Sequence, residues 1–513
     1  MSASINGKVY LVGAGPGDPK LITVRGKELL ALADTIIYDY LANPALLAFA
    51  KASAEKIYVG KKGGSKNALH QDHINHLIIE AAQSGKKVVR LKGGDPFIFG
   101  RGGEEAEALA AAGVPFEVVP GVTAAIGVPT YAGIPLTHRE VASSIAIITG
   151  HEDPEKETQH IHWEKLATAC DTLVCLMGMA NLSVMAAKLI EHGKDRSTPI
   201  ALIQWGTYPY QKTVIGTLET IVDRAKVEGI KPPVVMVIGE VVSLRVPMNW
   251  FEALPLFGRK ILVTRAREQS HEFVDLLTER GAEVRTAPTI KIVPPENFDP
   301  LDEAIRKVEQ YNTIIFTSVN GVRFFKERLY HLGFDIRVLK GISLCAIGPR
   351  TREEIVSLGV QCDVIPSEFI AEGVLDALEK RGIAGKRFLI PRAMEAREVL
   401  PSEIKKRGGA VDVVPAYQTI APERQVFEAV FEKGRVDMIT FASASTVRNF
   451  MEGLDSSRLE LAKRSVIACI GPITAQSAEK YGLRVSVMPK EYTFPALTEA
   501  IVQYYKGLKQ VSV

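Results

Sequence analysis

The chain has 513 residues, which at about 150 residues per domain corresponds to about three or four domains. Apolar residues make up 46% and charged residues 24%, a composition typical of globular proteins that excludes an intrinsically disordered chain. With 62 basic and 59 acidic residues, the net charge of +3 excludes the strongly basic surface of a dedicated nucleic-acid-binding protein.

Further absences in the sequence narrow the class of protein. No apolar run reaches the roughly 18 residues of a membrane span, and the first residues form no apolar signal sequence. The five cysteines are odd in number and form no C-x-x-C pair, which argues against a disulfide framework or a zinc site. We therefore expect a cytoplasmic protein that binds no membrane, no nucleic acid and no metal.

The N-terminal half alternates short β-branched segments with longer helical patterns, which predicts α/β sheets with largely buried strands. A polar stretch at residues 151–160 predicts a surface loop. Pro247 and Pro255 bracket a short aperiodic segment, and we place the main domain boundary there, near residue 257. The predicted strands of this half are residues 8–13, 35–39, 56–60, 86–91, 144–150, 172–177 and 233–239.

The C-terminal half repeats itself. Three pairs of matching segments begin at residues 258 and 385, at 316 and 441, and at 346 and 469. The offsets between the members of the pairs are therefore similar, at 127, 125 and 123 residues. Such a repeat predicts two similar α/β lobes, and two lobes of this kind commonly leave a cleft between them.

The first predicted strand is followed by the turn Gly13-Ala-Gly-Pro-Gly-Asp18. The dinucleotide-binding fingerprint G-x-G-x-x-G requires glycine where this chain has Asp18, and the turn has no P-loop lysine. The turn therefore argues against a nicotinamide-dependent dehydrogenase. It is either part of another ligand site or only a tight connection from strand to helix.

A longer glycine-rich segment runs from Arg90 to Glu105 and also begins in a strand. Loops at the carboxyl ends of strands are where α/β folds bind ligands. The backbone at Gly93 and Gly94 would lie against a flat adenosine or pyrrole, and Asp95 would accept hydrogen bonds from hydroxyls. Alternatively, Asp95 only caps the turn that follows. Residues 120–125 and 133–139 form similar loops of small residues.

Together, these loops resemble the uroporphyrinogen-III C-methyltransferases of the tetrapyrrole methylase family, across about residues 6–251. The resemblance implies two α/β lobes that bind S-adenosylmethionine between them. It also implies that Asp39 is a proton acceptor and Lys61 a proton donor, both at predicted strand ends. The donor-binding residues that it implies are Pro16, Gly93, Gly94, Asp95, Ile98, Thr123, Ala124, Met177 and Gly206.

The substrate of that family carries many carboxylates, and three arginines lie beside the predicted loops. Arg90, Arg101 and Arg139 would bind these carboxylates through charge-assisted hydrogen bonds. The alternative for each arginine is an ordinary surface position.

The C-terminal half contains no catalytic triad and no metal-ligand spacing, but hydroxyl-rich loops follow several of its strands. Hydroxyl groups and backbone N–H groups at helix starts form anion sites, although they also serve simply as helix caps. The loops at residues 316–321, 346–351, 441–447 and 470–475, together with Tyr417, resemble uroporphyrinogen-III synthase across about residues 258–508. Cleft residues implied by this resemblance are Ser318, Asn320, Thr351, Ser443, Ser445 and Thr474, with Tyr417 as a catalytic residue.

The two resemblances support each other, because the product of the synthase is the substrate of the methyltransferase. We expect an α/β protein with a two-lobed tetrapyrrole-methylase fold, followed by a two-lobed synthase of similar doubly wound α/β lobes. The methyltransferase would span residues 1–250, with lobes at about 1–138 and 139–250, and a linker would span 251–257. The synthase would span 258–513, with one lobe at 258–293 plus 418–513 and the other at 296–415.

The expected protein is bifunctional, cyclises hydroxymethylbilane to uroporphyrinogen III, and methylates that product for sirohaem or cobalamin. Its partners would be small tetrapyrroles and a second copy of the chain, which would dimerise through the methyltransferase. The alternative is a methyltransferase whose C-terminal half only binds a tetrapyrrole or the partner domain.

Overall fold

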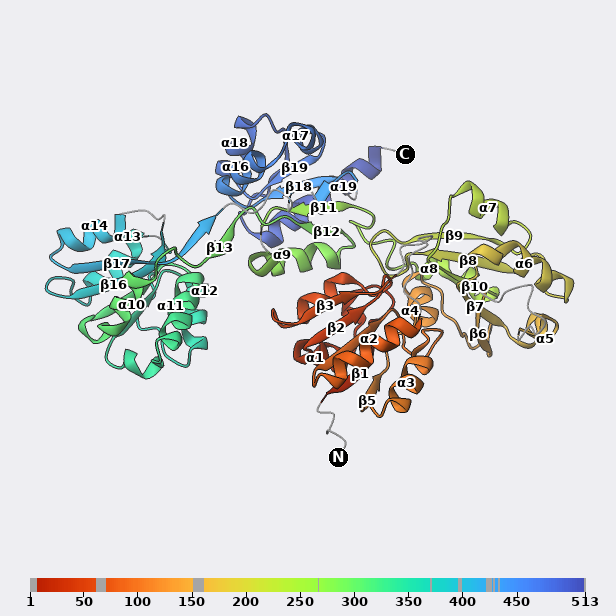
Figure 1. Ribbon diagram of the computed structural model, residues 1–513. Coiled ribbons are helices and arrows are strands. Elements are labelled where there is room, and N and C mark those ends of the chain that lie inside the picture. The colour runs from red at the N-terminus through yellow and green to blue at the C-terminus, as the bar shows by residue number, and fades with distance from the viewer. Residues whose placement is uncertain are drawn as a thin grey trace. The chain divides into compact units, whose positions relative to one another are not determined.

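The structure is a computed structural model that describes residues 7–60, 71–150, 161–265, 267–369, 371–394, 399–420, 427, 430–431 and 434–511. Within these residues the strands form four five-stranded sheets, each flanked by helices (Figure 1). The mixed α/β class predicted from the sequence is confirmed. The chain divides into two compact units, residues 1–261 with 275–284 and 501–513, and residues 262–274 with 285–500. In the described segments, no helix combines the length and apolar character needed to cross a membrane.

The first sheet is parallel throughout and has the order β3-β2-β4-β1-β5 (Figure 1). Because its strands run the same way, all of their carboxyl ends lie at one edge. Helix α1 covers one face, where Leu29 and Leu30 are buried, while α2 and α3 cover the other with Ile78 and Leu109. The elements are β1 (Lys8–Gly13), α1 (Val24–Leu32), β2 (Thr35–Tyr38), β3 (Glu55–Tyr58), α2 (Gln71–Gln83), β4 (Lys87–Lys92), α3 (Gly102–Ala111) and β5 (Phe116–Val119).

The second sheet has the order β6-β7-β10-β8-β9 and is mixed, because β10 runs antiparallel to both β7 and β8. Helix α4 buries Ala125 and Val128 against Val174 and Ala201 of this sheet, so α4 links the first sheet to the second. The elements are α4 (Ala124–Tyr131), β6 (Ile145–Thr149), α5 (Trp163–Ala169), β7 (Thr172–Leu176), α6 (Leu182–Glu191), β8 (Pro199–Gln204), β9 (Lys212–Thr217), α7 (Ile221–Val227), β10 (Val234–Ile238) and α8 (Arg245–Met248).

Three strands of the N-terminal half, β5, β8 and β9, were not predicted from the sequence. Strand β8 begins at Pro199, a residue that usually argues against a strand interior. Strand β9 lies at the sheet edge and buries only Val214 fully, so its sequence lacks the apolar signal of a central strand.

The last two sheets reproduce the repeat in the sequence. One has the order β12-β11-β18-β19-β20 and the other β13-β17-β16-β14-β15. The matched segments form β11 and β16, β18 and β14, and β19 and β15. In each sheet the three strands are neighbours in the same order, β11-β18-β19 and β16-β14-β15. The strands are β11 (Lys260–Val263), β12 (Glu283–Thr286), β13 (Lys291–Val293), β14 (Thr313–Phe316), β15 (Ser343–Ala346), β16 (Arg387–Ala393), β17 (Ala410–Ile420), β18 (Met438–Phe441), β19 (Val466–Cys469) and β20 (Val485–Val487).

Helices flank both of these sheets. Phe325 of α11 and Phe450 of α16 occupy corresponding buried positions in the cores of the two lobes. The helices are α9 (Arg267–Glu279), α10 (Asp299–Arg306), α11 (Val319–His331), α12 (Pro349–Ser357), α13 (Ala371–Glu379), α14 (Val399–Lys406), α16 (Ala444–Gly453), α17 (Ser456–Lys463), α18 (Pro472–Lys480) and α19 (Phe494–Val511). Short 3-10 helices are η1 (Pro19–Leu21), η2 (Pro44–Phe49), η3 (Met179–Asn181), η4 (Glu240–Leu244), η5 (Val308–Gln310) and η6 (Ile336–Leu339).

Candidate functional site

Three glycine-containing loops meet at the carboxyl edge of the first sheet. The backbones of Gly15 and Gly94 exchange two hydrogen bonds, of 3.2 Å from Gly15 N and 2.8 Å from Gly94 N. A Cβ added to Gly121 would lie 2.3 Å from the Gly94 carbonyl oxygen, and one added to Gly13 would lie 2.5 Å from Gly121 Cα. Glycine is required at these positions because the three backbones touch.

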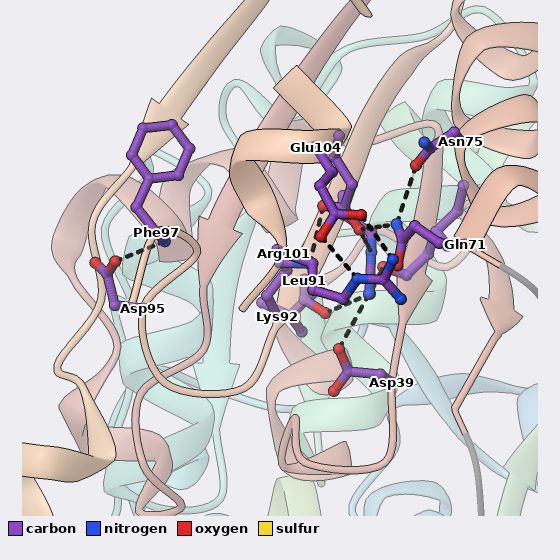
Figure 2. A network of polar contacts seen from close by, with 12 residues as sticks. Asp39, Gln71, Asn75, Leu91, Lys92, Asp95, Phe97, Arg101 and Glu104 are labelled. Carbon is purple, nitrogen blue, oxygen red and sulfur yellow. Dashed lines mark hydrogen bonds and ion pairs between the residues drawn. The ribbon is translucent and has the colours of Figure 1, made fainter. Parts of the chain in front are cut away.

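Asp95 fastens two of these loops together. Its Oδ1 accepts a hydrogen bond from Phe97 N at 2.8 Å, which Figure 2 shows, and its Oδ2 accepts one from Gly121 N at 3.0 Å. The carboxylate therefore caps the turn that follows it, which confirms the capping interpretation of the sequence. Each oxygen keeps a further lone pair, so the contact to ligand hydroxyls remains a prediction.

Strained backbone is concentrated in the loops that follow three strands of the N-terminal half. The described segments contain five non-glycine residues with positive φ: Phe99 (53°), Arg101 (57°), Met177 (56°), Trp205 (49°) and Thr207 (68°). All five follow β4, β7 or β8. Such conformations cost about 1–3 kcal/mol each and cluster at ligand sites, where the surrounding structure holds them.

Four of the remaining donor-binding residues predicted from the sequence lie on helix α4 or against it. Thr123 caps its N-terminus by accepting a hydrogen bond from Ala125 N at 3.3 Å. A Cβ added to Gly206 would lie 2.2 Å from Val128, and one added to Gly127 would lie 2.8 Å from Pro16. Pro16, Thr123, Ala124 and Gly206 therefore lie on or against α4. Ile98 and Met177 instead expose 40% and 51% of their surface, which leaves both side chains free to contact a ligand.

The N-terminal half contains a cluster of aromatic rings that was not predicted from the sequence. The ring of Trp205 lies 5.7 Å from Tyr40, 5.6 Å from Tyr208 and 6.0 Å from Tyr210. Burial raises the pKa of Tyr208 to about 12, so its phenol stays protonated at neutral pH. These contacts join the loop that contains Asp39 to the loop that contains Gly206. The close spacing of the aromatic residues in the segment 205–210 is the sequence signal that could have indicated this cluster.

Asp39 is the outer end of a buried charge network (Figure 2). Its Oδ2 accepts a hydrogen bond from Arg90 Nη2 at 3.1 Å, and Arg90 Nε donates to Glu105 Oε1 at 3.1 Å. Lys92 Nζ pairs with Glu105 Oε2 at 2.9 Å. The side chains of Arg90, Lys92 and Glu105 are at most 5% exposed, whereas that of Asp39 is 26% exposed. Two cations and two anions therefore balance each other, and only Asp39 faces solvent.

The prediction that Arg90 binds substrate carboxylates is wrong. Its guanidinium already donates to Asp39, to Glu105 and to the backbone oxygens of Ile37 and Leu91. Strand alternation places Arg90 on the sheet face that α2 and α3 cover. Which face a strand residue lies on becomes known only from the register of the strand in the sheet.

The other two arginines are exposed. Arg101 pairs with Glu104 through Nε at 2.9 Å and Nη2 at 2.6 Å, while Arg139 lies in the turn between His138 and Ala142. Both positions are compatible with binding an anionic substrate. Lys61, the implied proton donor, lies outside the described residues.

In the C-terminal half, Ser318 and Tyr417 are brought together. Their hydroxyl oxygens lie 3.0 Å apart, and Ser318 also caps α11 by accepting a hydrogen bond from Gly321 N at 3.0 Å. The Tyr417 ring is 8% exposed and stacks on Phe324 at 5.8 Å. Asn320 lies in the first turn of α11, beside Ser318.

The remaining synthase residues predicted from the sequence lie at other helix starts. Ser443 and Thr446 form a capping box for α16, and Ser443 lies 3.0 Å from the hydroxyl of Ser445. Thr351 in α12 and Thr474 in α18 are 4% and 5% exposed. The capping interpretation is thus confirmed for Ser318 and Ser443, whereas substrate binding by these residues remains a prediction.

Two family models match the chain, one in each half. The model of the Tetrapyrrole (Corrin/Porphyrin) Methylases matches residues 8–222, and that of Uroporphyrinogen-III synthase HemD matches residues 271–499. The Porphyrin biosynthesis protein HemD of Ruminiclostridium josui is 39% identical over 504 residues, which cover 98% of this chain and 99% of the relative. The chain belongs to this family of fused porphyrin-biosynthesis proteins.

The fused protein is an enzyme of tetrapyrrole biosynthesis with a methyltransferase domain followed by a synthase domain, as the resemblances implied. The S-adenosyl-L-methionine-dependent uroporphyrinogen III methyltransferase of Methanosarcina barkeri is 52% identical over 238 residues, which cover 46% of this chain and 93% of the relative. The crystal structure of uroporphyrin-III C-methyltransferase from Thermus thermophilus with S-adenyl homocysteine is 39% identical. It covers 46% of this chain and 100% of its own, with a TM-score of 0.40.

Proposed function

We propose that the methyltransferase half transfers two methyl groups from S-adenosylmethionine to uroporphyrinogen III and yields precorrin-2. The meeting of the loops at Gly15, Gly94 and Gly121 carries this proposal, because α/β folds bind ligands beyond the carboxyl ends of their strands, where these three loops touch. The strained Met177 and Gly206, which lies between the strained residues Trp205 and Thr207, belong to the proposed donor-binding set, together with Pro16, Asp95, Ile98, Thr123 and Ala124. The relative from Methanosarcina barkeri, which is named as dependent on S-adenosyl-L-methionine, supports the choice of donor.

The residues of this half have distinct roles in the proposed reaction. S-adenosylmethionine supplies an electrophilic methyl group when it is bound. Asp39, held by Arg90 at 3.1 Å, is the partly exposed carboxylate that accepts the proton released from the pyrrole ring. Lys61 donates a proton, and Arg101 and Arg139 bind substrate carboxylates. Positioning of the reactants and exclusion of water supply most of the rate enhancement.

The synthase half closes hydroxymethylbilane to uroporphyrinogen III, with loss of water and inversion of ring D. Tyr417 donates a hydrogen bond to the departing hydroxyl, and Ser318 fixes the direction of its phenol. Asn320, Thr351, Ser443, Ser445 and Thr474 bind the substrate. The pairing of Tyr417 with Ser318 supports this assignment, because it places the phenol at the start of α11, where the predicted substrate-binding residue Asn320 also lies.

Several further properties belong to the proposal. The product feeds sirohaem or cobalamin synthesis, the protein is cytoplasmic, and it dimerises through the methyltransferase half. The methyltransferase spans residues 1–250 and the synthase 258–513. The separate sheets, with β1 to β10 on one side of this boundary and β11 to β20 on the other, support the division. No metal takes part in either proposed reaction.

A coupled assay on the full chain tests the proposal. The protein is incubated with hydroxymethylbilane and S-adenosylmethionine, and the products are identified by mass and by isomer. We expect dimethylated product from the wild-type protein, unmethylated type III isomer from Asp95→Ala, and no dimethylated product from Tyr417→Phe unless uroporphyrinogen III is supplied. Methylated product without any acceleration of type III formation would refute the synthase assignment.

A further inference from the structure

Residues 249–258, which the sequence analysis predicted to be largely linker, pack onto the methyltransferase. Trp250 Nε1 donates to the Thr130 carbonyl at 3.1 Å, and Gly258 N donates to the Pro209 carbonyl at 3.0 Å. The Phe251 ring is 7% exposed and lies 4.7 Å from the ring of Tyr131. The segment is therefore fixed both to the end of α4 and to the loop after β8.

Glu252 is the charged centre of this segment. Its Oε1 accepts hydrogen bonds from Gln211 Nε2 at 2.8 Å and from Thr213 Oγ1 at 2.6 Å. Its Oε2 pairs with Arg245 Nη2, and the side chains of Glu252 and Arg245 are only 16% and 9% exposed. A carboxylate with three donors in such a poorly solvated place is held in one orientation.

The carboxylate of Glu252 in turn orients the amide of Gln211, which is 4% exposed. An amide has a donor end and an acceptor end, and Glu252 accepts only from the donor end, at a shorter distance (2.8 Å) than the Tyr131 carbonyl (3.4 Å). The acceptor end, Oε1, is thereby directed to the backbone N–H of Thr207, at 2.8 Å.

Thr207 is the residue that this chain of contacts holds in place. It has the left-handed φ of 68°, which is unfavourable for threonine, and it is 2% exposed. Its Oγ1 accepts a hydrogen bond from Asp18 N at 2.9 Å. Gly206 directly precedes Thr207 and Pro16 lies two residues before Asp18, and both belong to the proposed donor-binding set.

We infer that Glu252 is a positioning residue of the donor site: through Gln211 it holds the loop of Thr207 and Gly206 in its strained conformation. The segment that connects the two enzymes is therefore a working part of the first. The inference rests on the proposed binding of S-adenosylmethionine at these loops.

The test uses the full chain and the variant Glu252→Ala. The measurements are the calorimetric affinity for S-adenosylhomocysteine, the KM for S-adenosylmethionine and the kcat of methyl transfer. We expect the affinity to fall about tenfold or more and KM to rise, with kcat within about threefold of wild type. The matched control is Glu219→Ala, which removes an exposed glutamate paired with Arg196 at 3.1 Å and is expected to change nothing.

Gln211→Ala provides a second, independent variant and a double-mutant cycle. Because Glu252 acts through Gln211, the double variant is expected to bind S-adenosylhomocysteine no more weakly than the weaker single variant. A general loss of stability would instead produce additive effects. The cycle therefore separates positioning of the loop from simple destabilisation.

Three results would overturn the inference: affinity within twofold of wild type for Glu252→Ala, the same for Gln211→Ala, or an equal loss in Glu219→Ala. Gln211→Ala decides the matter if Glu252→Ala does not fold. Failure of the proposed function has a different signature, since the wild-type protein would then not bind S-adenosylhomocysteine at all.

Discussion

The hydroxyl oxygens of Ser318 and Tyr417 lie 3.0 Å apart, although 99 positions separate the two residues in the chain. Ser318 accepts a hydrogen bond from Gly321 N, and its own proton remains available for the phenol or for a substrate. The Tyr417 ring is held by Phe324 at 5.8 Å. The phenol is thus fixed by a helix cap and an aromatic neighbour, as a catalytic hydrogen-bond donor requires.

Tyr417→Phe is expected to lower the rate of type III formation by about 10²–10⁴-fold, the usual contribution of a positioned acid. The ring and its packing on Phe324 are retained, so the protein is expected to fold. Hydroxymethylbilane closes unaided to the type I isomer, which is then expected to accumulate. Isomer analysis by chromatography measures the effect, and supplied uroporphyrinogen III should still be methylated. A wild-type rate of type III formation would leave Tyr417 with a packing role alone.

Asp95→Ala removes both carboxylate contacts that fasten the loop of Phe97 to that of Gly121. Hydrogen bonds to a charged group contribute about 1.5–3 kcal/mol each, so we expect the affinity for S-adenosylhomocysteine to fall at least about tenfold. Asp95→Asn keeps one acceptor oxygen, and its affinity for S-adenosylhomocysteine is expected to lie between those of the wild-type protein and Asp95→Ala. Calorimetry measures the affinity, with synthase activity as the internal control. Unchanged affinity in Asp95→Ala would refute the position of the donor site.

The adjacent residues Glu104 and Glu105 offer a matched test of the buried network. Glu105→Gln leaves Arg90 and Lys92 with less counter-charge, and breaking a buried pair typically costs about 3–5 kcal/mol. Glu104→Gln removes only an exposed pair with Arg101, for which under about 1 kcal/mol is expected. All three tryptophans precede residue 251, so tryptophan fluorescence during urea unfolding reports on the methyltransferase half. Equal losses in the two variants would contradict the network.

The burial of Lys92 leads us to expect that the stability of the protein depends on pH. Burial lowers the pKa of its ammonium, the charge of Arg90 acts in the same direction, and Glu105 opposes both. In the unfolded chain the pKa returns to about 10.4, so between the two values the unfolded chain binds more protons. The contribution of this group to the free energy of unfolding therefore increases as pH rises through that range.

Relative to Lys92→Met, the wild-type protein is expected to gain stability as the pH is raised from about 7 to about 10. Urea unfolding at several pH values, followed by tryptophan fluorescence, measures the difference. Lys226→Met, which removes an exposed lysine, controls for the loss of a surface charge. Parallel stability curves for wild type and Lys92→Met would contradict the burial effect.

The chain is expected to separate into two active proteins, provided that the cut falls after the packed segment. A fragment of residues 1–258 retains Glu252 and the Gly258–Pro209 hydrogen bond and is expected to bind S-adenosylhomocysteine like the full chain. A fragment of residues 1–247 lacks both and is expected to bind at least about tenfold more weakly. Equal binding by the two fragments would show that the segment has no role in the donor site.

The sequence by itself determined the α/β class and the internal repeat. Both follow from local features of the chain, the periodicity of buried residues and recurring short segments. It also indicated that the loops at Gly13 and Gly93 follow strands, where α/β folds bind ligands. Strand β9 was not predicted from the sequence, because an edge strand needs little apolar surface.

Only the tertiary structure decided which polar groups meet. In the structure, Arg90 is a buried partner of Asp39, and the hydroxyl of Tyr417 contacts that of Ser318. Glu252, which was predicted to be in a linker, accepts a hydrogen bond from Gln211. Each contact joins different elements or the connections between them. Strand order, register and helix packing bring such residues together, and none of these is encoded in the spacing of residues along the chain.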